Sequence, residues 1–197
     1  MKVSQEKLIE VVKTGEVVSF PTDTVPALAA RPDRAAAIFT LKGRSLKKPL
    51  ILLGADFADL QSYIQGSATE IVAWRQITEK YWPGALTLIL PASSEVPEDM
   101  NPRDRSTIGI RVPALRVARE ILRQTGPLAT TSANRSGESP LETANAIEDV
   151  FPQVATLEGN DFPNNVTVGS GLPSTVAKWT GKGWEILRHG SIAIEEK

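Results

Sequence analysis

The side chains best suited to bind a charged ligand gather between residues 31 and 48 of this 197-residue chain. This segment holds six cationic residues and one carboxylate, a local charge of +5: Arg31, Arg34, Lys42, Arg44, Lys47 and Lys48 against Asp33. Arginine offers phosphate a planar fork and lysine a mobile point charge, so the triplet Lys42-Gly43-Arg44 suits a polyphosphate. In an extended backbone, residues two apart point to the same face, which would aim both cations at one ligand. The alternative is a solvated helix end, whose dipole favours cations.

A second candidate group follows an expected apolar strand and precedes an expected helix. Residues 130–137 have the sequence Thr-Thr-Ser-Ala-Asn-Arg-Ser-Gly, in which Ser132 and Asn134 carry short polar side chains. Open α/β sheets commonly bind ligands at such strand ends, where a hydroxyl and an amide can donate to phosphate or ribose oxygens. The alternative is an ordinary turn, because serine, asparagine and glycine are turn residues.

A third group lies in a loop that leaves a strand at Phe20. Thr22, Asp23 and Thr24 supply two hydroxyls and a carboxylate that could orient a small polar substrate. The same residues could instead form a local Asx or ST turn. The sequence therefore leaves two interpretations of this loop, a substrate pocket and a structural turn.

Weaker signals lie further along the chain. Arg111 stands at the end of an expected strand, with its charge available to an anion. The aromatic pair Tyr81-Trp82 is expected to pack in the core rather than to stack on bases. His189, the single histidine, is expected on the surface rather than as a general base.

Counting excludes several chemistries. The chain has no cysteine, so disulfides, thiolate nucleophiles and iron–sulfur clusters are ruled out, and one histidine argues against a zinc site. We expect no metal ligands from protein side chains. Neither the P-loop nor the dinucleotide-binding glycine fingerprint occurs. With 22 basic and 23 acidic residues the net charge is −1, which does not indicate a globally basic nucleic-acid binder.

The same composition bears on location and size. No run approaches the roughly 20 apolar residues of a membrane span, and the charged first residues lack the apolar stretch of a secretory signal. These observations predict a cytoplasmic protein without membrane contact. A chain of 197 residues fits one domain, and we expect a single domain over residues 1–197.

Capping residues, apolar spacing and turn residues predict the elements that position these groups. Helices are expected between Ser4 and Gly15 and over 33–43, 56–65, 67–81, 113–126 and 142–150. Strands are expected over 16–20, 49–53, 86–90, 107–112, 128–131, 154–157, 175–179 and 184–187. Helices and strands interleave without repeats, which predicts an α/β fold on a twisted mixed sheet.

Taken together, these segments resemble the YrdC-like family of threonylcarbamoyl-AMP synthases in its short single-domain form. The similarity runs over about residues 16–192, and the K-x-R and S-x-N pair is its most specific part. The motifs occur in this order: Pro21-Thr22-Asp23-Thr24-Val25, Lys42-Gly43-Arg44, Lys48-Pro49-Leu50, Trp82-Pro83-Gly84, Ser132-Ala133-Asn134-Arg135-Ser136-Gly137, Ser174-Thr175-Val176 and Arg188-His189-Gly190.

The resemblance implies an α/β twisted open mixed sheet with flanking helices and a concave, positively charged cavity. It implies an L-threonylcarbamoyladenylate synthase, which converts L-threonine, bicarbonate and ATP to threonylcarbamoyl-AMP and pyrophosphate. Mg²⁺ would be carried with the ATP. The activated group would pass through partner proteins to tRNA, forming threonylcarbamoyladenosine. Family members also bind double-stranded RNA and tRNA.

Site residues carry over where this chain matches the family. Lys42 and Arg44 match the K-x-R and would act as the catalytic, phosphate-holding pair, while Ser132 and Asn134 match the S-x-N and would hold the nucleotide. By position, the resemblance further places Arg188 at the nucleotide and the following residues at the threonine: Thr22, Arg111 and Ser174.

One loop departs from the family pattern. Where the family usually has T-V-Y-G-L, this chain has Thr24-Val25-Pro26-Ala27-Leu28. Pro26 lacks an N–H and fixes φ, so we expect this loop to follow its own path. The alternative function is a YrdC-like paralogue that binds RNA or nucleotide through the same cavity without making the adenylate.

Overall fold

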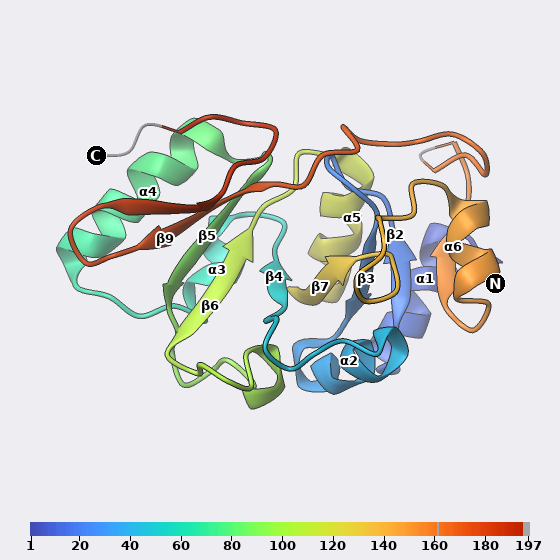
Figure 1. Ribbon diagram of the computed structural model, residues 1–197, viewed down its shortest axis with the longest axis horizontal. Helices are drawn as coiled ribbons and strands as arrows, with labels where there is room; N and C mark the ends of the chain where they lie inside the picture. The colour runs from blue at the N-terminus through green and yellow to red at the C-terminus, as the bar shows by residue number, and fades with distance from the viewer. Residues whose placement is uncertain (161, 195–197) are drawn as a thin grey trace.

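The computed structural model describes residues 1–160 and 162–194 and contains a ten-stranded mixed sheet within them (Figure 1). The strand order is β1-β8-β2-β3-β7-β4-β6-β5-β9-β10. Four neighbouring pairs are parallel: β1/β8, β2/β8, β4/β6 and β5/β9. The strands are β1 (Lys2–Val3), β2 (Val18–Phe20), β3 (Ala27–Ala30), β4 (Ile51–Leu53), β5 (Leu86–Pro91), β6 (Thr107–Arg111), β7 (Leu128–Ser132), β8 (Ala155–Leu157), β9 (Thr175–Trp179) and β10 (Trp184–Arg188). The predicted mixed α/β sheet is confirmed.

Helices cover both faces of this sheet. They are α1 (Gln5–Lys13), α2 (Ala35–Lys42), α3 (Phe57–Gln61), α4 (Ala68–Tyr81), α5 (Arg116–Thr125) and α6 (Ala144–Val150), with 3₁₀ turns η1 (Pro32–Arg34) and η2 (Glu98–Met100). In Figure 1, α3 and α4 lie at one end of the molecule and α1, α5 and α6 towards the other. No helix of the described part is long and apolar enough to cross a membrane.

Two apolar clusters form the core. The first joins the buried faces of α1, α5 and α6, and the second joins those of α2, α3 and α4. Adjacent residues of a strand point to opposite faces, and on β4 Leu52 belongs to the second cluster while Leu53 belongs to the first. At the centre of the sheet, the two clusters therefore lie on opposite faces.

Local signals positioned several elements correctly. Ser67 caps α4 by accepting the Glu70 N–H, and the Glu70 carboxylate accepts the Ser67 N–H. This is the capping box that the sequence predicts. Ser4 caps α1 through the backbone N–H of Lys7. Strand β9 has the predicted bounds. These signals work because each depends on residues a few positions apart.

Other expectations were wrong. Asp33 does not cap α2, because the chain first makes the 3₁₀ turn η1 and Asp33 pairs with Arg31 at 2.8 Å. Pro113 does not begin α5, which starts at Arg116. Strand β3 was missed because its four residues, Ala-Leu-Ala-Ala, are all buried and show no alternation.

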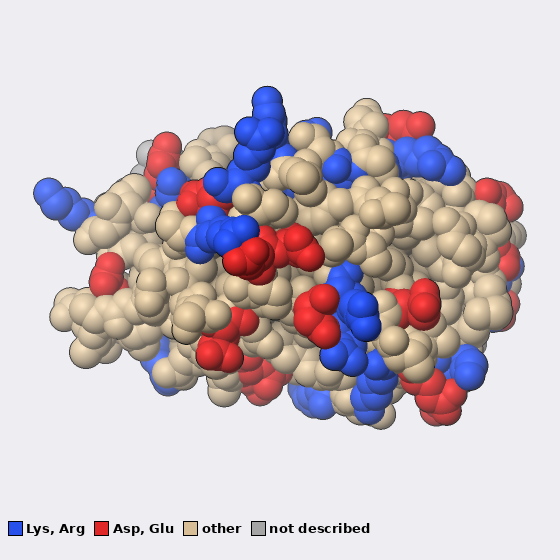
Figure 2. All heavy atoms as spheres, turned by 90° about the horizontal axis from the view of Figure 1, so that it is seen from below, with Lys and Arg blue, Asp and Glu red and all other residues tan. Residues whose placement is uncertain are grey.

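Charges on the underside of the molecule are mixed. Figure 2 views this side and shows Lys and Arg interspersed with Asp and Glu rather than gathered by sign. This face accords with the small net charge of −1. Any anion site must therefore depend on local clustering within the fold.

Candidate functional site

A pocket of about 390 Å³ opens where several chain segments converge at the middle of the sheet. Six of the eight predicted site residues line it: Thr22, Arg44, Arg111, Ser132, Ser174 and Arg188. They come from the β2–β3 loop, the α2–β4 loop, the ends of β6, β7 and β10, and the turn before β9. The fold thus brings together segments that are up to about 170 positions apart.

The remaining two, Lys42 and Asn134, contact each other directly behind the residues that form the pocket wall. The Lys42 Nζ donates to Asn134 Oδ1 at 3.1 Å and to the Ser132 carbonyl oxygen. The Ser132 hydroxyl also donates to Asn134 Oδ1, at 2.6 Å. Asn134 is fixed in turn by its own amide nitrogen, which donates to the carbonyl oxygens of Arg135 and Glu138. The K-x-R and S-x-N segments therefore form one hydrogen-bonded unit.

The conformation of the K-x-R segment differs from the extended one that we considered. Lys42 is the last residue of α2, and Gly43 ends the helix in the left-handed region at φ +59°, a conformation that glycine adopts without steric cost. Lys42 is 3% exposed, whereas Arg44 lies on the pocket wall. The helix-end alternative thus describes the backbone correctly, and the two cations do not share one face.

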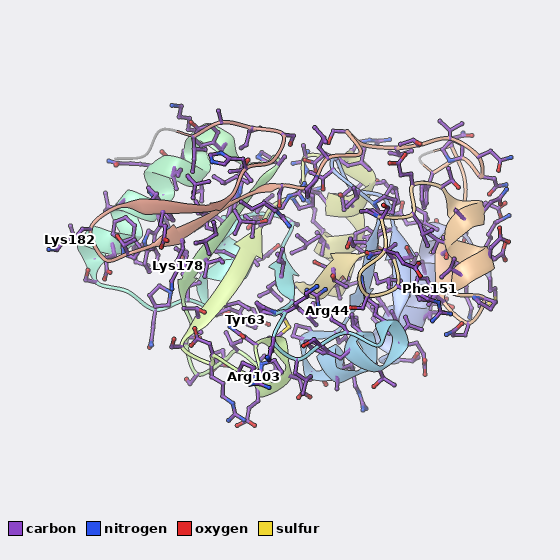
Figure 3. All side chains as sticks on the ribbon, in the orientation of Figure 1. Arg44, Tyr63, Arg103, Phe151, Lys178 and Lys182 are labelled. Atoms are coloured by element: carbon purple, nitrogen blue, oxygen red, sulfur yellow. The ribbon has the colours of Figure 1, made fainter. Side chains whose placement is uncertain are left out.

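Arg44 lies in front of β4 and β7 in Figure 3, where its guanidinium is anchored by backbone. Its Nε donates to the carbonyl oxygen of Lys48 and its Nη2 to that of Pro49, both at 2.9 Å. Burial lowers the pKa of Arg44. Burial, followed by the charges of Arg44 and Lys48, lowers the pKa of Lys42 to about 7.

Arg111 is buried and held at three points. Its Nε donates to the Gly84 carbonyl oxygen at 2.9 Å, its Nη1 to Thr24 Oγ1 at 2.8 Å, and its Nη2 lies 2.7 Å from Asp23 Oδ1. Burial lowers the pKa of Arg111, and the Asp23 charge opposes that shift. Arg111 therefore both lines the pocket and fixes the β2–β3 loop.

The β2–β3 loop contains the ST turn that was one of its two interpretations. The Thr22 hydroxyl donates to the Val25 carbonyl oxygen at 2.7 Å and accepts the Thr24 N–H at 3.2 Å. Thr22 and Thr24 also line the pocket, so the turn and the pocket wall are the same structure. The Pro26 carbonyl oxygen accepts the Ala133 N–H at 2.9 Å, which joins this loop to the S-x-N segment.

Arg188 and Ser174 form the far wall. The Arg188 Nε and Nη2 donate to the Ser174 carbonyl oxygen at 3.0 and 2.9 Å. The Ser174 hydroxyl lies 2.8 Å from Thr87 Oγ1. Burial, followed by the charge of Arg111, lowers the pKa of Arg188. Two arginines thus face the same cavity closely enough to repel each other.

The charge of this wall is one-sided. Four cationic side chains line the pocket, and none of its described lining residues is Asp or Glu: the cations are Arg44, Lys48, Arg111 and Arg188. Such a wall suits a ligand with several negative charges. Hydroxyls of Thr22, Ser132 and Ser174 add neutral donors beside the cations.

Comparison with known proteins gives the family. The Sua5/YciO/YrdC family model, described as telomere recombination, matches residues 10–190. The chain belongs to the Sua5/YciO/YrdC family. Relatives include the threonylcarbamoyl-AMP synthases of Nitrosococcus oceani, 37% identical over 72% of this chain, and of Bacillus subtilis, 34% identical over 93%. This chain spans 76% of the first relative but only 52% of the second.

Solved structures agree with this assignment. Pyrococcus abyssi Sua5 in complex with L-threonine matches 96% of this chain with a TM-score of 0.82 and 27% identity, and this chain spans 56% of its length. Escherichia coli YciO matches 97% with a TM-score of 0.78, at 24% identity, and this chain spans 94% of it. The predicted family and fold are confirmed.

In this Sua5/YciO/YrdC fold, two residues that line the pocket belong to segments singled out from the sequence but were not assigned to the site there. Lys48 belongs to the basic segment, and its exposed side chain lines the pocket beside Arg44. Thr24 accepts a hydrogen bond from Arg111. The local positive charge is the only feature of the sequence that indicates Lys48, because the fold sets its distance to the other wall residues.

The minor sequence signals have structural explanations. Trp82 packs against Phe57 with ring centroids 6.3 Å apart, and its Nε1 donates to the Leu86 carbonyl oxygen at 2.7 Å. The expectation of a packing role is confirmed for this residue. His189 is exposed, as expected.

Proposed function

We propose that this chain is a threonylcarbamoyl-AMP synthase, which joins L-threonine, bicarbonate and ATP and releases pyrophosphate. The observation that carries the proposal is a pocket with four cations and no carboxylate among its described lining residues, backed by the unit of Lys42, Ser132 and Asn134. The names of curated relatives at 31–37% identity support it. The chain spans as little as 52% of the length of these relatives.

The proposed reaction needs no covalent protein nucleophile. The amine of threonine and bicarbonate form a carbamate with loss of water, and a carbamate oxygen then attacks the α-phosphorus of ATP. The bond from that phosphorus to the bridging oxygen breaks, and pyrophosphate leaves with its electron pair. Catalysis of such a step consists mainly of positioning the reactants and neutralising phosphate charge.

Each wall of the pocket has a part in this proposal. Arg44, Lys48 and Arg188 would neutralise the phosphates, and Ser132 would donate to nucleotide oxygens. Thr22, Arg111 and Ser174 are proposed to hold threonine, and Arg111 retains guanidinium N–H groups beyond its three protein contacts. Lys42 and Asn134 act from behind the wall, where Lys42 positions the Asn134 amide.

Mg²⁺ is proposed to arrive with the phosphates of ATP. Among the described residues, no group of three histidine, aspartate or glutamate side chains could hold a metal ion. Phosphate oxygens are ligands that Mg²⁺ prefers. The cation would neutralise part of the triphosphate charge beside Arg44 and Lys48.

The product is proposed to serve tRNA modification in the cytoplasm. Threonylcarbamoyl-AMP is a mixed anhydride, so a partner enzyme that transfers acyl groups to tRNA must consume it. This chain is proposed to contact that partner and tRNA or double-stranded RNA.

Pyrophosphate release tests the proposal. The purified chain should release pyrophosphate only with ATP, L-threonine and bicarbonate together, and Arg44→Gln, Lys42→Ala and Asn134→Ala should each lower the rate by about tenfold or more. Lys7→Ala, on the exposed side of α1, is the control and should keep the rate. Pyrophosphate release at the same rate without threonine, or no release from a folded chain, would contradict the proposal. A chain that binds ATP or RNA without turnover would be the paralogue instead.

A further inference from the structure

A second cavity of about 250 Å³ lies at the carboxyl ends of β4 and β6 and shares no lining residue with the first. These two strands are parallel neighbours. After β4 the chain enters α3, whose Leu60 packs in the second apolar cluster; after β6 it enters α5, whose Ile121 packs in the first. In Figure 1, α3 and α5 accordingly flank β4. Parallel strands whose connections leave to opposite faces create the crevice in which α/β proteins bind ligands.

One side of this second cavity is apolar and aromatic. Phe57 and Trp82 line it with ring centroids 6.3 Å apart, and Pro83 and Val112 complete the surface. The Trp82 Nε1 already donates to the Leu86 carbonyl oxygen, so the indole is fixed and needs no further polar partner. This wall suits a flat apolar group.

Two arginines without partners also line this cavity. Arg119 and Arg123 stand four residues apart on α5, so their side chains lie on the same face of the helix. Neither side chain makes a hydrogen bond or an ion pair with any described residue, and the Arg119 Nε is buried without an acceptor. A buried N–H without an acceptor is rare, so this group is free to donate to a ligand that enters the cavity.

Two carboxylates on the rim limit the charge of that ligand. Asp56 and Glu79 line the cavity and are exposed, and Asp56 Oδ1 accepts the Asp59 N–H at 3.1 Å as the cap of α3. They disfavour a dianion such as a phosphate monoester more than a monoanion. A carboxylate matches a guanidinium in charge and in planar geometry.

We propose that this second cavity binds a small aromatic carboxylate, with the carboxylate on Arg119 and Arg123 and the ring against Phe57 and Trp82. A cavity of roughly 150 Å³ accepts benzene. The volume of about 250 Å³ therefore leaves room for a ring and a short acid chain. The site is separate from the proposed synthase pocket and does not depend on that activity.

Calorimetric titration of the full chain with 3-phenylpropionate tests this site. We expect saturable binding of one equivalent, unchanged when ATP fills the first pocket. The neutral 3-phenylpropanol and the dianionic phenyl phosphate should each bind about tenfold more weakly or worse, since each lacks the matched charge. Titration with L-phenylalanine distinguishes two kinds of ligand, a free amino acid and an acid without an ammonium group. An amino-acid ligand would bind more tightly than 3-phenylpropionate, because its ammonium reaches Glu79 or Asp56.

Arginine variants locate the binding. Arg119→Gln and Arg123→Gln should each weaken it by about tenfold, while Arg116→Gln should not, because Arg116 lies outside the cavity and pairs with Glu120 at 3.2 Å. Arg123 is exposed, so its variant tests the site without disturbing the core. The absence of saturable heat, equal affinity for the alcohol, displacement by ATP, or full binding by the folded double variant would overturn the proposal.

Discussion

The Lys42 side chain is buried, and its Nζ contacts oxygen acceptors rather than open solvent. It is 3% exposed, and its Nζ reaches both members of the S-x-N pair. Burial is the main cause that lowers its pKa to about 7, and the positive charges of Arg44 and Lys48 add to the shift. A negative ligand beside Arg44 and Lys48 would cancel that repulsion and raise the pKa again.

This reversal predicts that ATP binding takes up a proton. At about pH 8 the free protein holds Lys42 mostly neutral, because that pH lies above a pKa of about 7. Bound ATP raises the pKa, so part of the population gains a proton; well below pH 7 Lys42 is already charged and uptake should vanish. Titration calorimetry in buffers of different ionisation enthalpy measures this uptake.

The matched variant is Lys42→Met, whose unbranched side chain is one atom shorter than that of lysine and cannot titrate. It should bind ATP without this uptake at pH 8, even if more nucleotide is needed for saturation. Equal uptake by the variant and the parent chain would mean that another group titrates.

At the scale of elements, the turn before β9 depends on close backbone contact with the end of β10. A Cβ atom on Gly190 would lie 2.3 Å from the Pro173 carbonyl oxygen and 2.4 Å from backbone atoms of Ser174 and Thr175. The Gly190 N–H also donates to Thr175 Oγ1 at 3.0 Å. Only glycine lets the C-terminal segment approach the turn that carries Ser174.

Gly190→Ala should therefore displace this turn. Overpacking of this kind costs about 1–3 kcal/mol of unfolding free energy, and ATP affinity should fall because Arg188 is anchored on Ser174. Denaturant unfolding and nucleotide titration measure the two effects.

Gly109→Ala is the matched control, because its new Cβ would meet Ile51 at 3.5 Å, an ordinary contact. It should leave stability nearly unchanged. Equal behaviour of the two variants would show that the contact at Gly190 relaxes without cost.

At the scale of the whole molecule, a continuous sheet joins the two apolar clusters. All four tryptophans report on the second cluster, because Trp74 is buried in it and three more pack against it: Trp82, Trp179 and Trp184. Strands β3, β7 and β4 pair in succession, and each carries residues of both clusters. We expect the chain to unfold as one cooperative domain, because neither cluster can open without breaking this shared sheet.

Leu8→Ala tests this cooperativity from a distance. Leu8 is fully buried in the first cluster, and its truncation should cost about 2–5 kcal/mol. Tryptophan fluorescence, which reports the second cluster, should shift to lower denaturant by the same amount as circular dichroism, which reports all helices and strands. A fluorescence midpoint that stays at its original value would instead reveal two independently unfolding domains.

The sequence by itself determined whatever depends on near neighbours. The capping box of Ser67 and Glu70, the bounds of strand β9 and the ordered motifs that gave the family all use contacts or spacings within a short stretch. The residue types of the site were also readable, since polyphosphate chemistry requires cations beside hydroxyl and amide donors.

The tertiary structure alone decided how those groups face one another. Lys42 lies behind the wall and Lys48 on it, because α2 continues to Lys42 and the chain turns at Gly43. The hold of Asp23 and Thr24 on Arg111 joins residues about 87 positions apart. No local pattern encodes such a contact, because its distance is set by strand order and by helices that pack on both faces of the sheet.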